Sequence, residues 1–524
     1  MRFYYFVMLI ALVLLVDTSE AMELYVDHNT GQVFTAPGKH RTRLGDFQQM
    51  DAKPATKMAT KEDIKAVENK INTRIDSVVN KPKNPSEAVA VMDDKGLRFD
   101  TNDGQFKFAI NGRLESDADM FAGGDIKTYN DVDKSGTYNK DEDGDITNNR
   151  LTDGTEIRRL RMEFSAQYYN DWKMKLQPEL ANGGGDLTIG IRDAFVQYTG
   201  FNEYGTFTVG QSKQPYSYQQ MMSDTNLLFM ERSTEYEFTN RSVNRAIGLR
   251  YDNGGTWWGF GTGIFGDTAT RQTSGTATQG DEGWGGAARI TIAPWFKHEE
   301  LAHFGISGAF RAPATNNRSV QYKIAPTAIS QLSYLDTGKM PDIQNSQFIN
   351  AETVGIYGPL SLEAEYNATW FNSNDAANSG KGEGLEKTAG NGYFQGAHVD
   401  VAYSLTGESR ANGYDPMMGV TRRIKPNHNL TFSDEGWGAF EVTSRFMWVD
   451  MNQTGNSTFA GGNQVASTVG VNWYFNNWMR TMVNWTHVYS LDVGEAGHNR
   501  TVLSVPGNTT GDWDYVQARV QMVY

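Results

Sequence analysis

The chain has 524 residues, no cysteine and a formal net charge of −14 at pH 7. The lack of cysteine excludes disulfide frameworks, thiolate zinc sites and cysteine nucleophiles, and the acid excess argues against a nucleic-acid partner, whose phosphates need a basic surface. Glycine (54 residues) and aromatic residues (12%) are abundant and proline is scarce (14), which favours β-strands joined by tight turns.

Residues 1–21 are predicted to be a secretory signal peptide. Arg2 supplies the basic start, an uninterrupted apolar stretch covers 4–16, and Ser19 and Ala21 are small residues at positions −3 and −1 of a cleavage site. That apolar stretch is short for a membrane anchor, and no later apolar run is long enough for a transmembrane helix. The mature protein is therefore expected to begin near Met22 and to leave the cytoplasm.

Residues 22–95 are predicted to form a periplasmic N-terminal segment. The segment is polar at first, and then apolar residues recur at spacings of three and four, at Ile64, Val67, Ile71, Ile75 and Val78. This spacing predicts a short amphipathic helix over 60–79, which Thr60 opens with a capping-box arrangement. Two interpretations stay open, a trimerising coiled coil and a single periplasmic helix that packs on an unknown partner.

From residue 96 onward the dominant period is two. In 513–524, for example, Val516, Ala518 and Val520 alternate with polar residues. Both a soluble β-sandwich and a membrane barrel show this alternation. The segments run for about ten to fourteen residues, longer than the usual five or six, and aromatic residues such as Trp172 and Tyr524 lie near their ends. These two features favour an all-β transmembrane barrel.

The alternation predicts a 16-stranded antiparallel transmembrane β-barrel over 96–524. Its strands are expected at 105–121, 156–169, 172–181, 187–200, 205–212, 244–252, 256–266, 284–297, 301–311, 346–358, 360–371, 391–406, 436–450, 463–475, 478–490 and 513–524. Connectors after even strands are short, except 407–435, and most connectors after odd strands are long. This parity is typical of an outer-membrane barrel with both termini in the periplasm, and sixteen strands leave an aqueous channel.

Several segments resemble the phosphate-selective porin O/P family, in the family's order over roughly 96–524. They are Gly96–Phe99, Asn111–Leu114, Arg158–Phe164, Asp193–Val196, Val209–Gln211, Phe229–Ser233, Leu405–Arg410, Trp437–Glu441 and Gly470–Tyr474. The resemblance implies a trimeric porin whose third external loop, 213–243, folds inward. It also implies lumenal arginines at Arg113, Arg158 and Arg159. The family's lysine cluster has no counterpart between Gln214 and Glu231, which weakens the expectation of phosphate selectivity.

The predicted function is an outer-membrane porin through which small anions, with phosphate a candidate, diffuse passively. Five bases lie on three neighbouring strands and should give a modest anion preference. The candidate pore-lining and anion-binding residues are Lys107, Arg113, Arg158, Arg159, Arg161, Lys173, Lys175, Arg192 and Arg445. Expected partners are outer-membrane lipid, small inorganic anions and two further copies of the chain. The alternatives are a weakly selective general porin and a structural or adhesive outer-membrane protein.

One segment fits the pattern of a calcium-binding loop. Oxygen donors occur at the required spacing over 131–142, with glycine at the sixth position and a glutamate at the twelfth. The candidate ligands are Asp131, Asp133, Ser135, Thr137, Asn139 and Glu142. An acidic external loop without an ion would carry the same residues, so both interpretations stay open. No cofactor is otherwise expected.

No grouping of residues predicts catalysis. His398, Asp400 and Ser404 share one face of a predicted strand, but a polar lumen accounts for such a trio without any chemistry. The sequence contains neither an HExxH nor a GxSxG motif. We therefore expect a protein that is not an enzyme.

Overall fold

The structure is a computed structural model. It describes residues 22–47, 70, 86–93, 96–124, 126–128, 147–149, 151–181, 189–237, 243–269, 282–315, 318, 320–330, 333–337, 340, 342–373, 391–433, 436–453, 459–493 and 511–524. The predicted signal peptide, the predicted calcium loop and the predicted helix at 60–79, apart from a helical Lys70, lie outside these residues. No helix in the described parts is long and apolar enough to cross a membrane.

The chain divides into two compact units, residues 1–83 and 84–524. The first unit contains a small antiparallel sheet in the order β2-β1-β3, formed by β1 (Met22–Asp27), β2 (Val33–Phe34) and β3 (Arg41–Phe47). The Arg41 guanidinium lies 3.4 Å from the centre of the Phe34 ring. The sequence analysis did not predict this sheet, because its short strands show no clear alternation.

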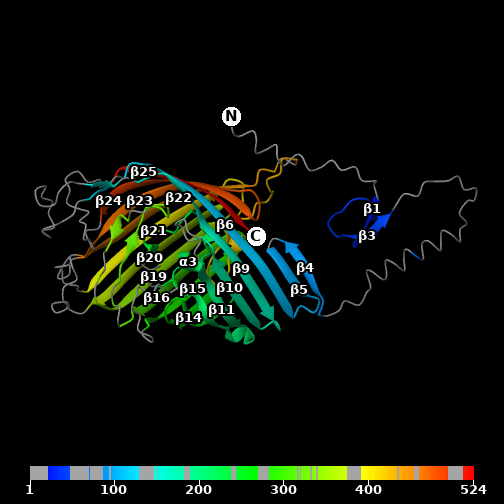
Figure 1. Ribbon diagram of the computed structural model, residues 1–524, viewed down its shortest axis with the longest axis horizontal. Helices are drawn as coiled ribbons and strands as arrows, with labels where there is room; N and C mark the ends of the chain where they lie inside the picture. The colour runs from blue at the N-terminus through cyan, green and yellow to red at the C-terminus, as the bar shows by residue number, and fades with distance from the viewer. Residues whose placement is uncertain are drawn as a thin grey trace, which may run out of the picture. The chain divides into compact units, whose positions relative to one another are not determined.

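The second unit is a closed barrel whose ring contains sixteen of the described strands, all antiparallel to their neighbours (Figure 1). They are β6 (Phe106–Ala122), β9 (Gly154–Tyr168), β10 (Trp172–Glu179), β11 (Gly190–Tyr198), β12 (Thr206–Lys213), β13 (Arg245–Gly254), β14 (Trp258–Phe265), β15 (Trp284–Lys297), β16 (Glu300–Ala312), β19 (Ile343–Tyr357), β20 (Leu360–Ser373), β21 (Gly392–Ser404), β22 (Ala439–Gln453), β23 (Phe459–Tyr474), β24 (Met479–Val493) and β25 (Trp513–Val523). β25 pairs with β6 and closes the ring, with Arg519 opposite Asp117. The predicted fold class is confirmed for the barrel, and every observed boundary lies within four residues of the expected one.

The barrel is apolar outside and polar inside. In β6, Leu114 and Met120 are 41% and 60% exposed on the outer face, whereas Glu115 and Asp117 are 0% and 4% exposed on the inner face. Soluble β-proteins bury their apolar face instead, so this inverted pattern requires a nonaqueous solvent around the strands.

A β-bulge changes the alternation at one functionally important point. Arg159 pairs with Glu115 and Ile157 with Ser116, so the register between β9 and β6 shifts at Arg158. An extra residue in one strand re-aims the side chains beside it. As a result two consecutive arginines, Arg158 and Arg159, both reach the interior, whereas simple alternation would send one of them outward.

A hairpin outside the ring extends the wall at the end of the barrel where the C-terminus lies. It consists of β4 (Ala88–Asp93) and β5 (Gly96–Thr101), and β5 pairs with the first residues of β6 (Figure 1). Gly112 and Tyr524 exchange backbone hydrogen bonds of 3.0 and 3.1 Å beside it. Gly96 has φ 91°, and a Cβ there would lie 2.2 Å from Asn111 Oδ1 and 3.1 Å from the Tyr524 backbone, so glycine is needed.

The described residues of three connecting segments fold into the barrel. We call residues 214–244, which follow β12, the inner loop; it contains α3 (Tyr218–Met221) and η2 (Asp224–Asn226). The cap loop, 313–342, contains β17 (Lys323–Ile324) and β18 (Leu335–Asp336), and packs Tyr322 and Tyr334 among apolar side chains at the end opposite the C-terminus. The plug loop, 405–438, contains η4 (Arg410–Gly413). The remaining described elements are η1 (Asn202–Tyr204) and the pair β7 (Ile126–Thr128) and β8 (Thr147–Asn149).

The plug loop explains the one exception to the loop parity. It enters the barrel from the C-terminal end and meets the inner loop, where the Tyr218 hydroxyl lies 2.6 Å from Thr421 Oγ1 and Arg410 donates to the Asn226 carbonyl at 3.2 Å. This connector is long because its residues extend into the barrel.

Candidate functional site

Among the described residues, two sizeable cavities lie in the interior of the barrel. The upper chamber, of about 380 Å³, is bordered by the cap loop, and the lower chamber, of about 280 Å³, is bordered by the plug loop. Four residues line both chambers and therefore mark the boundary between them: Arg161, Lys213, Asp224 and Arg245.

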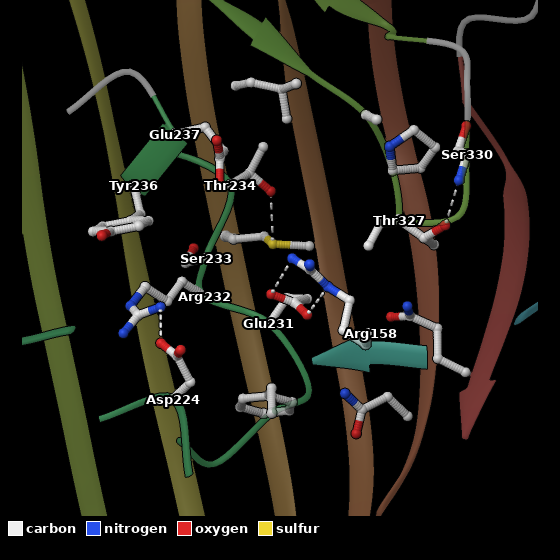
Figure 2. Close-up of a pocket in the computed structure, with 18 of the residues that line it drawn as sticks. Arg158, Asp224, Glu231, Arg232, Ser233, Thr234, Tyr236, Glu237, Thr327 and Ser330 are labelled. Carbon is white, nitrogen blue, oxygen red and sulfur yellow. Dashed lines mark hydrogen bonds and ion pairs between the residues drawn. The ribbon is translucent and has the colours of Figure 1, made fainter. Parts of the chain in front are cut away.

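The surface of the upper chamber is basic. In the part of the chain that the structure describes, three acidic side chains line it, Asp224, Glu231 and Glu237, all from the inner loop. Nine basic side chains line it: Arg158, Arg159, Arg161, Arg192, Lys213, Arg232, Arg245, Lys323 and Arg445. Figure 2 shows Asp224 with Arg232 and Glu231 with Arg158, facing Thr327 and Ser330 of the cap loop.

Asp224 lies at the centre of four guanidinium groups. Its carboxylate is 2.6 Å from Arg232 Nη1 and 2.7 Å from Arg161 Nη1. The two remaining partners are Arg113 at 3.2 Å and Arg159 at 3.5 Å. One loop carboxylate thus occupies the point where bases from β6 and β9 converge.

Glu231 plays a similar role higher on the inner loop. Its carboxylate is 2.9 Å from both Arg158 and Arg159, and 2.7 Å from Arg519. The bulge in β9 makes this arrangement possible, since it turns two adjacent arginines toward the same carboxylate.

Both loop carboxylates are held in the ionised form. Burial alone would raise the pKa of the Asp224 carboxyl, but its four guanidinium partners outweigh burial and hold that pKa well below its usual range. Burial likewise opposes ionisation of Glu231, and its arginine partners lower the pKa of its carboxyl well below the usual range. The acids are therefore permanent negative charges in the lumen.

A second set of acids lies behind the basic surface, four of them in the barrel wall and Asp336 in the cap loop. Each pairs with a base that lines the upper chamber without lining that chamber itself. The pairs are Arg159 with Glu115 (2.6 Å), Arg192 with Glu179 (3.2 Å), Arg245 with Asp193 (2.6 Å), Lys323 with Asp336 (3.4 Å) and Arg445 with Asp400 (2.7 Å). Arg161 also pairs with Glu179. The bases keep acidic partners on one side and face the chamber on the other.

Other wall arginines hold the inner loop by its backbone. Arg480 donates to the Leu227 carbonyl at 3.0 Å, Arg519 to that of Met230 at 2.5 Å and Arg445 to that of Glu231 at 3.1 Å. Asn472 donates to the carbonyl of Leu228 at 2.9 Å. These contacts position residues 227–231, and with them the Glu231 carboxylate.

The candidate residues from the sequence fall into three groups. Arg158, Arg159, Arg161, Arg192 and Arg445 line the upper chamber, and Arg113, Arg161 and Lys175 line the lower one. Lys107 and Lys173 line neither and are exposed near the C-terminal end of the barrel.

Further charged residues that line the chambers were not candidates from the sequence. They include Lys213, Asp224, Glu231, Arg232, Glu237, Arg245, Arg250 and Lys323. Alternation in the strand at 244–252 was a usable signal for Arg250, since it faces inward with Asp252. The resemblance implies that loop 213–243 folds inward, but this loop carries no comparable periodicity, so no pattern indicated that Asp224 and Glu231 would be the residues that contact the arginines.

A buried polar cluster anchors the inner loop to the opposite wall. His398 Nδ1 lies 2.5 Å from Glu235 Oε1 and its Nε2 3.0 Å from Gln219 Nε2. Glu363, His398 and Asp400 are close enough to hold a metal ion together, but Gln219 and Arg445 already occupy these groups. Ser404 donates to Glu408 at 2.7 Å, so its hydroxyl is engaged away from His398.

Comparisons with known proteins agree on one kind of protein. Residues 136–523 match the family "Phosphate-selective porin O and P". The chain is similar to Porin O of Pseudomonas aeruginosa, 23% identical over 411 residues, which cover 73% of this chain and 83% of that protein.

Two solved structures are also similar. One is the outer membrane channel DcaP of Acinetobacter baumannii, with a TM-score of 0.44 and 10% identity, covering 81% of this chain and 99% of that one. The other is an anion-selective porin from Comamonas acidovorans, with a TM-score of 0.43 and 13% identity, covering 80% and 100%.

Proposed function

The chain belongs to the family of phosphate-selective porins O and P, and from that premise we propose that its two chambers carry small anions, phosphate among them, by passive diffusion. As a member of this family the protein is a porin of the bacterial outer membrane, a channel rather than an enzyme.

The basic surface of the upper chamber carries the proposal. Nine basic and three acidic side chains face this space, so a permeating anion meets mostly guanidinium and ammonium groups. Fixed positive charge along a narrow aqueous path lowers the energy of an anion there and raises that of a cation. Guanidinium groups also match the geometry of phosphate oxygens.

The acids behind the basic surface limit the strength of this preference. Glu115, Glu179, Asp193, Asp336 and Asp400 each pair with a base of the upper chamber. They offset much of the positive field, although none of them lines the upper chamber; Asp193 lines the lower one. We therefore propose a modest anion preference, with weaker phosphate binding than a cluster of unpaired lysines would give.

Zero-current potentials across planar bilayers test the proposal. With purified protein and a tenfold KCl gradient, the potential should have the sign of chloride selectivity, and added phosphate should reduce the chloride current. A potential of the opposite sign at moderate salt contradicts the anion preference. A barrel that inserts without conducting would favour the adhesive or structural alternative.

We also propose a homotrimer, as the resemblance implies. Cross-linking in detergent should yield a species of three chains, and bilayer insertions should give conductance steps in groups of three. A single-chain species that conducts in unit steps contradicts the trimer.

The topology proposal places residues 22–95 in the periplasm after removal of signal peptide 1–21, and the long loops outside the cell. It is supported by the loop parity and by the hairpin and C-terminus at one end of the barrel. Tags at Ser274 or Asn374 should be reachable on intact cells, and a tag at Asn476 only after permeabilisation. The reverse labelling contradicts this orientation.

Calcium binding to the external loop 131–142 is a separate proposal, supported by the spacing of its oxygen donors. Hard oxygen ligands suit Ca²⁺ rather than softer metals. Calorimetry should show a calcium-dependent heat that Glu142→Ala abolishes and that Glu203→Ala, at an exposed turn, leaves intact. An unchanged heat in Glu142→Ala contradicts the proposal.

A further inference from the structure

The two chambers differ in the chemistry of their walls. Part of the lower chamber is apolar: Phe195 of β11, Met221 of α3, and Met417 and Met418 of the plug loop line it. The plug-loop methionines stand on a fixed backbone, because Arg289 donates to the Met418 carbonyl at 2.6 Å and to that of the next residue at 2.8 Å. An apolar group of a solute would leave water by packing against these side chains.

Lys213 is unlike every other base in the two chambers. Each of the other bases has a carboxylate within 4.0 Å, whereas in the part of the chain that the structure describes Lys213 has none. Its ammonium donates to the Met221 and Met222 carbonyls at 3.3 and 2.8 Å. The protonated amine carries three donors, and an oxyanion beside it favours that form, so one donor is available to such a ligand.

The position of Lys213 joins these two observations. It lines both chambers, and it lies at the end of β12, directly before the loop that carries Met221. Its nearest hydrogen-bond partners are thus the backbone of the apolar wall itself. A solute that reaches this amine through the lower chamber meets Met221, Met417 and Met418 in the wall of the same cavity.

We propose that the lower chamber is a binding subsite for organic anions that combine an oxyanion head with an apolar group of about one ring. Lys213 receives the head, and Phe195, Met417 and Met418 receive the apolar part. A cavity of about 280 Å³ lies just below the usual range for drug-sized ligands, roughly 300–1,000 Å³, which suits a solute of that size. This inference rests on the proposed anion channel and narrows its substrates.

The physical basis is the additional apolar burial. An inorganic ion gains nothing from the methionine and phenylalanine side chains, whereas a ring leaves water and also makes favourable contacts with thioether sulfur. Burial of one ring face is enough to strengthen binding by about tenfold over an anion with the same head and no ring.

Block of the KCl current by benzoate, acetate and inorganic phosphate tests the inference. In the wild-type protein benzoate should reach half-block at about one tenth of the acetate concentration. The double variant Met417→Gln, Met418→Gln should lose most of this benzoate advantage while phosphate block stays within about twofold of wild type. Lys213→Gln should weaken block by all three anions, because it removes the charge that receives the head.

Matched controls carry the same substitutions outside the chambers. Met92→Gln changes an exposed methionine of β4, and Lys297→Gln changes an exposed lysine at the end of β15. Both should behave as wild type. Should the double variant fail to insert into bilayers, Phe195→Gln tests the same wall from β11 and should also reduce the benzoate advantage.

Two failures are distinguishable in the same bilayers. If the zero-current potential shows anion preference but benzoate and acetate block equally, or the methionine variants keep the benzoate advantage, the subsite is wrong and the anion channel stands. If the wild-type potential shows cation preference, the proposed function itself fails and the subsite falls with it.

Discussion

Arginine side chains have different roles on the two sides of the lumen. On the open side, formed by β9 to β13, arginines paired with wall acids still face the chambers. On the filled side, formed by β20 to β25, Arg445 lines the upper chamber, whereas Arg480 and Arg519 are 1% exposed, line neither chamber and bind backbone carbonyls of the inner loop. The difference lies in what covers the arginine, because its charge and its alternating position are the same on both sides.

The filled side should therefore control stability, and the open side selectivity. The largest expected effect is on the filled side, where Glu441 pairs with Arg410 at 2.7 Å and both are buried. Glu441→Gln removes the charge that compensates Arg410, so the free energy of unfolding should fall by about 3 kcal/mol. Urea unfolding followed by the electrophoretic shift of the folded barrel measures this, with Glu203→Gln as the exposed control.

Bilayer measurements on the folded fraction of Glu441→Gln test whether the filled side affects stability alone or selectivity as well. Because Glu441 lines neither chamber, the zero-current potential in a KCl gradient should match the wild type. A stable variant with a strongly altered potential would show that the filled side also sets selectivity.

The second effect is on the open side and concerns charge removal. Replacing Arg159 and Arg161 by alanine takes two bases from the upper chamber and leaves Glu115 and Asp224 less compensated. The chloride-to-potassium permeability ratio should fall by roughly threefold, which moves the potential toward cation selectivity. Lys297→Ala, outside the chambers, should leave the ratio unchanged. An unchanged ratio in the double variant contradicts the open side as the ion path.

A smaller effect of opposite sign is expected for Asp224→Asn. The amide removes the one carboxylate that contacts four guanidinium groups, so these bases become available to permeating anions. The permeability ratio should rise by about twofold, and phosphate should block chloride current at lower concentration. A fall in the ratio would mean that Asp224 mainly keeps the arginines in place.

The smallest effect concerns pH. The pKa of the Asp224 carboxyl is held well below its usual range, so Asp224 remains charged at pH 5 as at pH 8. A carboxyl with a lowered folded-state pKa contributes stability that is present above its unfolded pKa, about 4, and is lost as the pH falls through the folded value. The difference in permeability ratio between wild type and Asp224→Asn should therefore stay constant from pH 8 to pH 5. A difference that shrinks with a midpoint inside this range contradicts the assigned charge state.

The strands were predictable because the alternation within each strand shows which of its side chains face lipid and which face the lumen. In β6 and β25 a two-residue period separates lipid-facing from lumen-facing side chains, and this local signal needs no knowledge of the neighbouring strands. The shorter β4–β5 hairpin and the sheet of 22–47 carry too few residues for such a signal. The outward position that alternation gives Arg158 is corrected by the bulge, which depends on the pairing partner.

The candidate site was predictable only in part. Arg113, Arg159 and Arg161 could be assigned to the inner face from β6 and β9 alone, and the family resemblance added Arg158. Their partners on the inner loop could not be assigned, since a loop without periodicity does not reveal which of its acids will meet the wall. The exposed Lys107 and Lys173 show the converse: an inner-face position near the barrel end does not bring a side chain into the chambers.

The sequence by itself determined that this chain forms a sixteen-stranded barrel with an apolar exterior and a charged interior, because alternation is a property of each strand in isolation. Only the tertiary structure decided which interior charges face water. The inner, cap and plug loops enter the lumen through contacts between residues far apart in the chain, such as Arg480 with Leu227. Those long-range contacts bury one set of arginines and bring Asp224 into contact with another. They also leave Lys213 at the boundary of the two chambers with no carboxylate beside it among the described residues.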